Sequence, residues 1–386
     1  MIEEGNVDMR DTSQPERTKL FHLLKAAWPL PVDEFFPLTY PFSPTDHVFT
    51  DARVVVREDE PSSIIAFTLD SQNYREQLAN SRQSRSDAPL TELRHADGSH
   101  YLYEFDTETI KLWCKIFFAE QFDALRHMCG CAEQFVQSLS RCFKWDSRGG
   151  KSGSAFLKTR DDRFVVKQLS RTELDGFSKF APQYFTYLAE CQSALRPTAL
   201  TKIFGYFRIG FKNTHTGRSF KMDFMVMENL LYGRSVDRIF DLKGSTRHRF
   251  VQESGQPHEV LQDENLMQRA QSSPLLVREH SKRILRTALH NDSLFLTEMN
   301  VMDYSLIMAL DTSRNKMVIG IIDYLRTYTW DKRVESFVKE TAILGGGGKG
   351  EPTIITPRQY RMRFLTFLDR NILMTPDPWI QSGWVQ

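Results

Sequence analysis

The sequence predicts an α+β protein with two lobes, antiparallel sheets and a cleft between the lobes. Apolar residues follow helical spacing over residues 107–142, and the period changes to two after Gly149 and Gly150. Beyond that change, strand-like segments come in pairs joined by turns, which is typical of antiparallel sheets. With 386 residues, 41% of them hydrophobic, the chain is long enough to build a core in each lobe.

The first 95 residues are expected to form an N-terminal flank. Five prolines occur between Trp28 and Pro44, and proline fixes φ and lacks a backbone donor, so residues 1–95 are expected to be partly extended. The N-terminal lobe is then predicted at residues 96–230 and the C-terminal lobe at residues 231–386.

The spacing of apolar residues predicts the helices and strands of the two lobes. Helices are expected at residues 107–142, 172–195 and 275–299. Strands are expected at residues 154–159, 163–169, 202–211, 219–228 and 316–323. The turns at 160–162 and 213–217 predict two hairpins in the N-terminal lobe.

Charge composition argues against a nucleic acid as partner. Lys and Arg number 50 against 49 Asp and Glu, so the chain has no overall basic excess. The charge is nevertheless uneven, because residues 1–60 carry twelve acids and six bases, whereas residues 201–250 carry ten bases and four acids. The segment 201–250 is therefore the candidate surface for an anionic partner.

Cysteines and hydrophobic runs bear on the cellular compartment. The five cysteines form no CxxC pair, and an odd number in a chain of this length suits buried thiols in a reducing compartment. The first residues lack a basic stretch followed by an apolar core, and no window approaches 18 uninterrupted apolar residues. We expect a cytoplasmic protein that contacts membranes only peripherally.

A glycine-rich segment, GGKSGSAF at residues 149–156, stands directly before a strand. Glycines let a backbone approach an anion and point N–H groups at it, although the same residues also suit an ordinary hairpin entry. Lys167 lies on the next strand, eleven residues after Phe156. This order of glycine loop and strand lysine is the one with which kinases hold nucleotide phosphates.

Two segments after the second hairpin are candidates for contacts with adenine and phosphate. VMENL (226–230) leaves an apolar strand where a chain crossing between lobes can offer backbone groups to adenine, or it is only a connector. DLKGSTRHR (241–249) places Asp241 and Lys243 before a glycine and then Arg247 and Arg249, a cluster that can hold phosphate oxygens by charge-assisted hydrogen bonds. The alternative for this second segment is a basic surface turn.

Two aspartates emerge from apolar segments in the second half of the chain. Asp303 precedes the apolar run of MDYSLIMAL, and Asp323 ends the strand KMVIGIID. Acids in such surroundings are costly to bury unless they meet cations, so a metal ion is a natural partner. One could position or deprotonate an attacking hydroxyl while the other holds magnesium at the nucleotide phosphates. Alternatively, each caps a helix or pairs with an arginine.

A loop with four consecutive glycines followed by Lys349 lies within residues 326–352. A flexible loop tipped with a cation and bracketed by apolar residues suits contact with an anionic membrane surface. An ordinary loop without such a role is the alternative interpretation.

Taken together, these segments resemble the catalytic domain of phosphatidylinositol phosphate kinases, and within that family the PIKfyve type, the phosphatidylinositol 3-phosphate 5-kinases. The resemblance runs from about residue 53 to about Trp379. It is carried by the strings RGGKSGSAF, DDRFVVKQL, FAPQYF, RPTALTKIFGYFRIGFKN, VMENLLYGR, DLKGS, MDYSL, GIIDYLRTYTWDK and ILGGGGK. Any one of them could arise by chance, but the ordered series is specific.

The resemblance implies ATP and Mg²⁺ as cofactors. The loop that covers the ATP phosphates would consist of Gly150, Lys151, Ser152, Gly153 and Ser154. The adenine hinge would consist of Met227, Glu228, Asn229 and Leu230. Lys167 would be the ATP lysine with Glu173 as its candidate acidic partner, and Asp323 would bind Mg²⁺.

The resemblance also implies positions for the lipid and the reaction. Asp303 would be the catalytic-loop aspartate, and Lys243 would take part in catalysis by facing the transferred phosphate or the lipid headgroup. Arg247 and Lys349 would contact the lipid. The segment 326–357 would be the activation loop that selects the lipid.

The chain departs from protein kinases and from the large members of the PIKfyve type. Tyr-Leu follows Asp323 in place of Phe-Gly, and no HRD string is present, so the motifs do not support protein kinase activity. The large enzymes carry a zinc finger that reads phosphatidylinositol 3-phosphate and a chaperonin-like region, and neither fits here. We expect either a fragment or a stand-alone kinase core, recruited by its own basic face or by a protein partner.

The implied reaction is transfer of the ATP γ-phosphate to the 5-hydroxyl of phosphatidylinositol 3-phosphate on endosomal or vacuolar membranes, which gives phosphatidylinositol 3,5-bisphosphate. A phosphatidylinositol 4-phosphate 5-kinase is the first alternative, and the loop ILGGGGKGEP argues against it. A non-catalytic membrane-binding scaffold is the second, and the presence of Lys167, Asp303 and Asp323 argues against it. A small-molecule or inositol phosphate kinase is the third. The sequence leaves the oligomeric state open.

Overall fold

A computed structural model describes the chain at residues 42–50, 52–85, 89–94, 98–145, 155–256, 259–311, 313–325 and 356–376. The chain divides into two compact units, residues 1–46 and 47–386. Only residues 42–46 of the first unit are described, and the fold given below is that of the second. In the described ranges no helix is long and apolar enough to cross a membrane.

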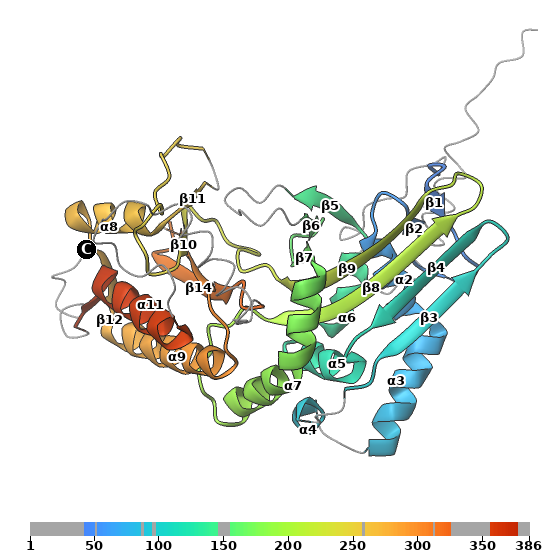
Figure 1. Ribbon diagram of the computed structural model, residues 1–386, viewed down its shortest axis with the longest axis horizontal. Helices are drawn as coiled ribbons and strands as arrows, with labels where there is room; N and C mark the ends of the chain where they lie inside the picture. The colour runs from blue at the N-terminus through green and yellow to red at the C-terminus, as the bar shows by residue number, and fades with distance from the viewer. Residues whose placement is uncertain are drawn as a thin grey trace, which may run out of the picture. The chain divides into compact units, whose positions relative to one another are not determined.

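The N-terminal half of the second unit is built on a seven-stranded antiparallel sheet with the strand order β3-β4-β8-β9-β7-β6-β5 (Figure 1). Its strands are β3 (Tyr101–Asp106), β4 (Ile110–Ile116), β5 (Cys142–Trp145), β6 (Phe156–Thr159), β7 (Phe164–Gln168), β8 (Ile203–Asn213) and β9 (Ser219–Glu228). The helices of this half are α2 (Ser62–Asp70), α3 (Gln72–Arg85), α4 (Pro89–Leu93), α5 (Ala119–Met128), α6 (Ala132–Leu139) and α7 (Arg171–Ser193). Earlier in the chain are the two-residue strands β1 (Asp46–His47) and β2 (Val56–Arg57).

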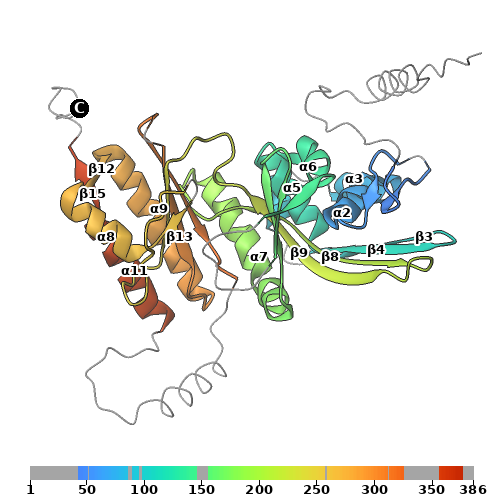
Figure 2. The same ribbon diagram turned by 90° about the horizontal axis from the view of Figure 1, so that it is seen from above.

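One face of this sheet is apolar and is covered by helices. In β4, Ile110, Leu112, Cys114 and Ile116 are buried and alternate with more exposed residues. Figure 2 shows α2, α3, α5 and α6 on one side of β3, β4, β8 and β9. Because successive side chains of a strand point to opposite faces, this alternation decides which face the helices cover.

The prediction of one helix over residues 107–142 is wrong in its first part, where residues 110–116 form β4. Trp113 stands at helical spacing from later apolar residues and so disguises the period of two. In the sheet its indole instead lies over Gly210 of β8, where a Cβ would come within 2.3 Å of the ring. The other elements predicted for this half, one helix and four strands, are confirmed to within two residues where the structure describes them.

Residues 47–95, expected in the flank, contribute three helices to this half of the fold. Every residue of α2 from Ser62 to Leu69 is buried, and Ile64 and Phe67 belong to the same core as the sheet. A helix that is buried on every side has no solvent-facing polar stripe, so its sequence shows no clear amphipathic pattern.

The C-terminal half contains a four-stranded sheet with the order β11-β10-β13-β14 and a two-stranded parallel sheet of β12 and β15. The strands are β10 (Arg238–Leu242), β11 (Val260–Leu261), β12 (Leu275–Arg278), β13 (Ser305–Asp311), β14 (Lys316–Ile322) and β15 (Ile372–Thr375). The helices are α8 (Asp263–Ser272), α9 (Glu279–Glu298) and α11 (Pro357–Asn371). Both halves therefore confirm the predicted α+β class with antiparallel sheets, to which the C-terminal half adds the parallel pairs β10–β11 and β12–β15.

The helix predicted at residues 275–299 begins only at Glu279. Residues 275–278 pair as β12 with β15, which lies near the C-terminal end of the described chain. The strand predicted at 316–323 is confirmed as β14.

Helix α7 lies between the two larger sheets in both views (Figures 1 and 2). The ring of Tyr187 stacks on Phe295 of α9 with 4.3 Å between the ring centres. After α7 the chain returns to the N-terminal sheet through residues 199–201, which we call the crossover segment. Within it Leu200 pairs in parallel with Ile321 of β14. The crossover segment therefore joins the two sheets at the end of β14.

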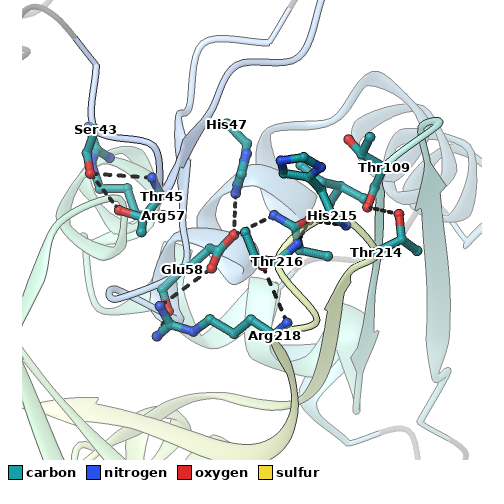
Figure 3. Close-up of polar contacts among 12 residues, drawn as sticks. Ser43, Thr45, His47, Arg57, Glu58, Thr109, Thr214, His215, Thr216 and Arg218 are labelled. Carbon is teal, nitrogen blue, oxygen red and sulfur yellow. Dashed lines mark hydrogen bonds and ion pairs between the residues drawn. The ribbon is translucent and has the colours of Figure 1, made fainter.

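Glu58 ties the start of the second unit to the turn between β8 and β9 (Figure 3). Its side chain is 2% exposed, and its carboxylate lies 2.8 Å from Nε2 of His47 and 2.9 Å from Nδ2 of Asn213. Arg218 adds an ion pair of 3.5 Å and donates to the Glu58 carbonyl at 3.0 Å. This cluster is a polar contact between segments far apart in the chain.

Replacing Glu58 with alanine should lower the free energy of unfolding by about 2 kcal/mol, because Asn213 and His47 lose a buried acceptor. This loss of stability is small for a buried ion pair. Arg218 is about half-exposed, so water can solvate its guanidinium group once the Glu58 carboxylate is removed. Urea unfolding followed by circular dichroism measures it. The control is Glu104→Ala on the exposed face of β3, expected to stay within about 0.5 kcal/mol. If Glu58→Ala and Glu104→Ala lost the same free energy of unfolding, the Glu58 cluster would not be a stabilising contact.

Candidate active site

Lys167 lies at the centre of the candidate site. It belongs to β7, which runs between β6 and β9 and buries residues 164–167. The Lys167 ammonium lies 3.1 Å from Oε1 of Glu173 and 3.0 Å from Oδ1 of Asp323, and its side chain is 3% exposed. The structure thus brings both acids predicted to act with Lys167 onto one ammonium group, and Asp323 comes from 156 positions away in the chain.

Glu173 is held by the N-terminal cap of α7. The Ser170 hydroxyl accepts a hydrogen bond from the Glu173 N–H at 3.3 Å. The N–H and hydroxyl of Ser170 donate to Oε2 of Glu173 at 3.0 and 2.9 Å, so a reciprocal capping box is complete. Oε1 then points to Lys167, only a short turn away on β7. The pattern Ser-x-x-Glu is visible in the sequence and supports the choice of Glu173 as the acidic partner.

Both charges of this pair are stabilised by their surroundings. Burial alone would lower the pKa of the Lys167 ammonium, but Asp323 and Glu173 raise it above its ordinary value. Burial alone would raise the pKa of the Glu173 carboxyl, but Lys167 and the hydrogen bonds from Ser170 bring it below its ordinary value. The site therefore keeps its cation and this carboxylate ionised at neutral pH.

Asp323 stands at the edge of a small pocket between β8 and β9 on one side and the end of β14 on the other. The pocket is lined by Thr201, Ile203, Met225, Met227, Ile322, Asp323, Tyr324 and Leu325. Its lining is largely apolar, and the Lys167–Asp323 ion pair is at its edge. Apolar side chains beside a cation are the kind of contacts that a base with attached phosphates uses.

The Asp323 carboxylate fits a role as a magnesium ligand. Protein sites for Mg²⁺ with nucleotides use one or two carboxylates together with phosphate oxygens and water. The side chain of Asp323 is 46% exposed, so a metal ion can reach its carboxylate without opening the core. Lys167 beside it offers a cation to the same phosphates.

The four residues of the predicted hinge have different surroundings. Met227 lines the pocket. The Glu228 carboxylate accepts from the Lys202 N–H at 2.7 Å, and the Asn229 amide donates to the carbonyl of Asp162 at 2.7 Å. The Leu230 side chain packs against Gly320, in the space that a Cβ at position 320 would occupy. The structure therefore brings Met227 directly to the pocket, while the side chains of Glu228 and Asn229 bind main-chain groups of neighbouring segments.

Lys243 and Asp303 meet on the C-terminal side of the site. The Lys243 ammonium donates a hydrogen bond to the main-chain oxygen of Asp303. Lys243 directly follows β10 and Asp303 shortly precedes β13, and these two strands are antiparallel neighbours with Leu242 opposite Leu306. The register of the sheet therefore explains why two loops 60 positions apart in the chain come together.

Asp263, the first residue of α8, organises the loop that carries Lys243, and no motif in the sequence singled it out. Its buried carboxylate accepts from three successive N–H groups, those of Lys243 at 3.0 Å, Gly244 at 2.7 Å and Ser245 at 3.3 Å. Arg249 donates to the other oxygen at 2.8 Å. The only local signal was an acid at the start of a helix.

The basic residues of 241–249 divide into two kinds. Arg249 pairs with Asp263 and, at 3.0 Å, with Asp241, and both acids raise its pKa against the opposing effect of burial. It is therefore part of the scaffold of the loop rather than a free phosphate ligand. Arg247 is exposed, as a contact with a lipid requires.

Parts of the predicted site lie outside the described residues. These are the predicted phosphate loop with Gly150, Lys151, Ser152, Gly153 and Ser154, residue Lys349, and positions 326–355 of the predicted activation loop. Their roles stay predictions, as do those of the described site residues.

Fold and site together define a class of protein. A buried strand lysine paired with an acid on a following helix and with a second acid at the edge of an apolar pocket is an arrangement typical of kinases. A family model described as Phosphatidylinositol-4-phosphate 5-Kinase matches residues 138–317 and 310–371. The chain belongs to the phosphatidylinositol-4-phosphate 5-kinase family, which confirms the resemblance to phosphatidylinositol phosphate kinases.

Several relatives bear the name 1-phosphatidylinositol 3-phosphate 5-kinase. The Saccharomyces cerevisiae protein is 39% identical over 97% of this chain and 20% of its own length. The Homo sapiens protein is 44% identical over 78% of this chain and 14% of its own length. One from Arabidopsis thaliana is 39% identical over 87% of this chain and 22% of its own length. The chain thus spans between 14% and 22% of the length of these three relatives.

Proposed function

We propose that this chain is the kinase part of a lipid kinase that transfers the γ-phosphate of ATP to the 5-hydroxyl of phosphatidylinositol 3-phosphate. The observation that supports this most is the convergence of Glu173 and Asp323 on Lys167 beside the apolar pocket. The choice of lipid is supported by the names of the relatives, which cover up to 97% of this chain.

Each side chain has a distinct role in this proposal. Lys167 neutralises phosphate charge of bound ATP, and Glu173 holds the lysine in place. Mg²⁺ would add charge neutralisation at the phosphates, with Asp323 as its ligand. Asp303 accepts the proton of the attacking 5-hydroxyl, and Lys243, bonded to the Asp303 main chain, faces the transferred phosphate.

The proposed place of action is the cytoplasmic face of endosomal or vacuolar membranes, where the substrate lipid is part of an anionic surface. Arg247 and Lys349 are proposed to contact the headgroup, and residues 326–357 are proposed to select it. A protein partner that recruits the chain belongs to the same proposal.

A direct test measures phosphate transfer to liposomes that contain phosphatidylinositol 3-phosphate, phosphatidylinositol 4-phosphate or phosphatidylinositol, with the headgroup position identified after the reaction. Turnover should be highest on the 3-phosphate. Asp303→Asn should reduce it by about 100-fold or more, because the proton of the attacking hydroxyl loses its acceptor. Asp106→Asn, on an exposed aspartate of β3, is the matched control and should change turnover by less than about two-fold.

Two outcomes would change the assignment. Preference for phosphatidylinositol 4-phosphate would favour the first alternative, which the description of the matching family model also names. Folded protein that binds ATP but phosphorylates none of the three lipids would favour a non-catalytic role.

A further inference from the structure

The segment after β14 departs from protein kinases, because Tyr324 rather than phenylalanine follows Asp323. The family assignment does not explain what the additional hydroxyl does. In the structure Tyr324 is 3% exposed, and its hydroxyl donates a hydrogen bond to the main-chain oxygen of Thr201 in the crossover segment. A buried hydroxyl that donates to a main-chain oxygen helps to fix the position of its segment.

The same residue of the crossover segment also holds the end of β14. The N–H of Thr201 donates to the carbonyl of Ile321 at 3.0 Å. Thr201 therefore binds the chain on both sides of Asp323, at Ile321 through its N–H and at Tyr324 through its carbonyl. These two hydrogen bonds close a ring that contains the 321–324 turn.

The ring of Tyr324 is also in contact with the helix that carries Glu173. It lies 6.2 Å from the ring of Tyr184 with 30° between the planes, and 6.2 Å from the ring of Phe180. Both partners belong to α7, whose first turn contains Glu173. One side chain thus links the crossover segment, the end of β14 and α7.

Asp323 needs such support because its backbone conformation is unfavourable. Its φ is +59°, in the left-handed region that residues with a side chain seldom adopt. A conformation of this kind persists only where the surrounding structure imposes it. The hydrogen bonds on either side of Asp323 supply that constraint, and they keep its carboxylate 3.0 Å from Lys167.

We propose that Tyr324 is a positioning residue whose hydroxyl, through Thr201, fixes Asp323 in the conformation that presents its carboxylate to Lys167 and to a nucleotide-bound Mg²⁺. This inference rests on the proposed function for the role of Asp323. The aromatic ring alone packs equally well as phenylalanine, so the effect belongs to the hydroxyl. Tyr324→Phe removes that group while it keeps the ring and the core.

Tyr206→Phe is the matched control. Tyr206 is fully buried in the N-terminal half, and its hydroxyl has no hydrogen-bond partner among the described residues. Deletion of this hydroxyl should therefore alter neither nucleotide binding nor local opening. The two variants share the same chemical change in the same kind of surroundings.

Two measurements on the full chain test the proposal. Hydrogen–deuterium exchange at residues 321–325 should be about five-fold faster in Tyr324→Phe. This factor corresponds to the loss of one hydrogen bond from the state that protects these amides. Equilibrium binding of ATP in the presence of Mg²⁺ should weaken by about the same factor, whereas binding of ATP in the presence of EDTA should stay unchanged, because only the Mg²⁺-dependent part uses Asp323. Tyr206→Phe should match the unaltered protein in all three respects.

Three results would overturn the proposal. These are unchanged exchange at residues 321–325, equal weakening of ATP binding with and without Mg²⁺, and equal effects of Tyr324→Phe and Tyr206→Phe. None of the measurements requires lipid turnover. If the unaltered protein phosphorylated no phosphoinositide, the proposed function would fail while exchange and ATP binding still decided the role of Tyr324.

Discussion

Replacing Lys167 with methionine should reduce phosphate transfer by about 1,000-fold, because the variant loses a buried cation at the edge of the pocket that is proposed to hold the nucleotide. The variant should also lose about 2 kcal/mol of stability, since the Glu173 carboxylate stays buried without its partner. Asp323 adds less to this loss because its side chain is about half-exposed. Lipid-kinase assays and urea unfolding measure the two effects.

The pH dependence of this stability difference identifies its cause. The pKa of Glu173 is lowered in the folded protein, so the ion pair contributes stability above the ordinary value of 4.5 and loses it as the pH falls through the lowered pKa. The gap between Lys167→Met and the unaltered protein should therefore narrow as the pH falls below 4.5. A gap that stays constant would show that lost packing, rather than lost charge, destabilises the variant.

Lys111→Met is the control for the loss of one lysine. Lys111 pairs with Asp106 at 2.7 Å on the distal part of the sheet, and both side chains are about 60% exposed. An exposed pair of this kind contributes little, so turnover should change by less than about two-fold. Retention of more than about a tenth of the activity in Lys167→Met would contradict the assigned role of Lys167.

Replacing Gly244 with alanine should reduce turnover by about 100-fold, because it displaces the loop that presents Lys243. A Cβ at position 244 would lie 2.6 Å from the Cα of Phe364 and 3.0 Å from its N, and these backbone atoms of α11 cannot move aside cheaply. The φ of Gly244 is +73°, which adds strain for any residue with a side chain. The expected loss of stability is about 3 kcal/mol.

Gly255→Ala separates the effect of the positive φ from the effect of the contact with α11. Gly255 has a φ of +70°, almost the same as Gly244, but a Cβ there would meet no atom within 4 Å. This variant should lose only about 1 kcal/mol from backbone strain and keep its turnover. If Gly244→Ala behaved like Gly255→Ala in both assays, contact with α11 would not be what holds the Lys243 loop.

Some parts of the site follow from local sequence. Ser170 and Glu173 form a capping box whose pattern is visible in four residues, and the turn between β7 and α7 is too short to place Glu173 far from Lys167. The strands β7, β9 and β14 have clear alternating or apolar patterns, so their ends, where functional residues stand, were predicted to within one residue.

Other parts depended on pairing between distant segments. β4 was mistaken for helix because Trp113 packs over Gly210 on a neighbouring strand, and that contact has no trace in local periodicity. β12 is a strand only because β15 pairs with it. The role of Asp263 was missed for the same reason, since its three backbone donors come from a loop about 20 residues earlier.

The sequence by itself determined the family, the order of its motifs and the α+β class, because these depend on residue identity and short-range pattern. Only the tertiary structure decided that Asp323 and Glu173 share the Lys167 ammonium, that Asp263 shapes the Lys243 loop, and that Thr201 holds both sides of Asp323. The physical reason is that hydrogen bonds and ion pairs act over about 3 Å in space, whatever the separation along the chain.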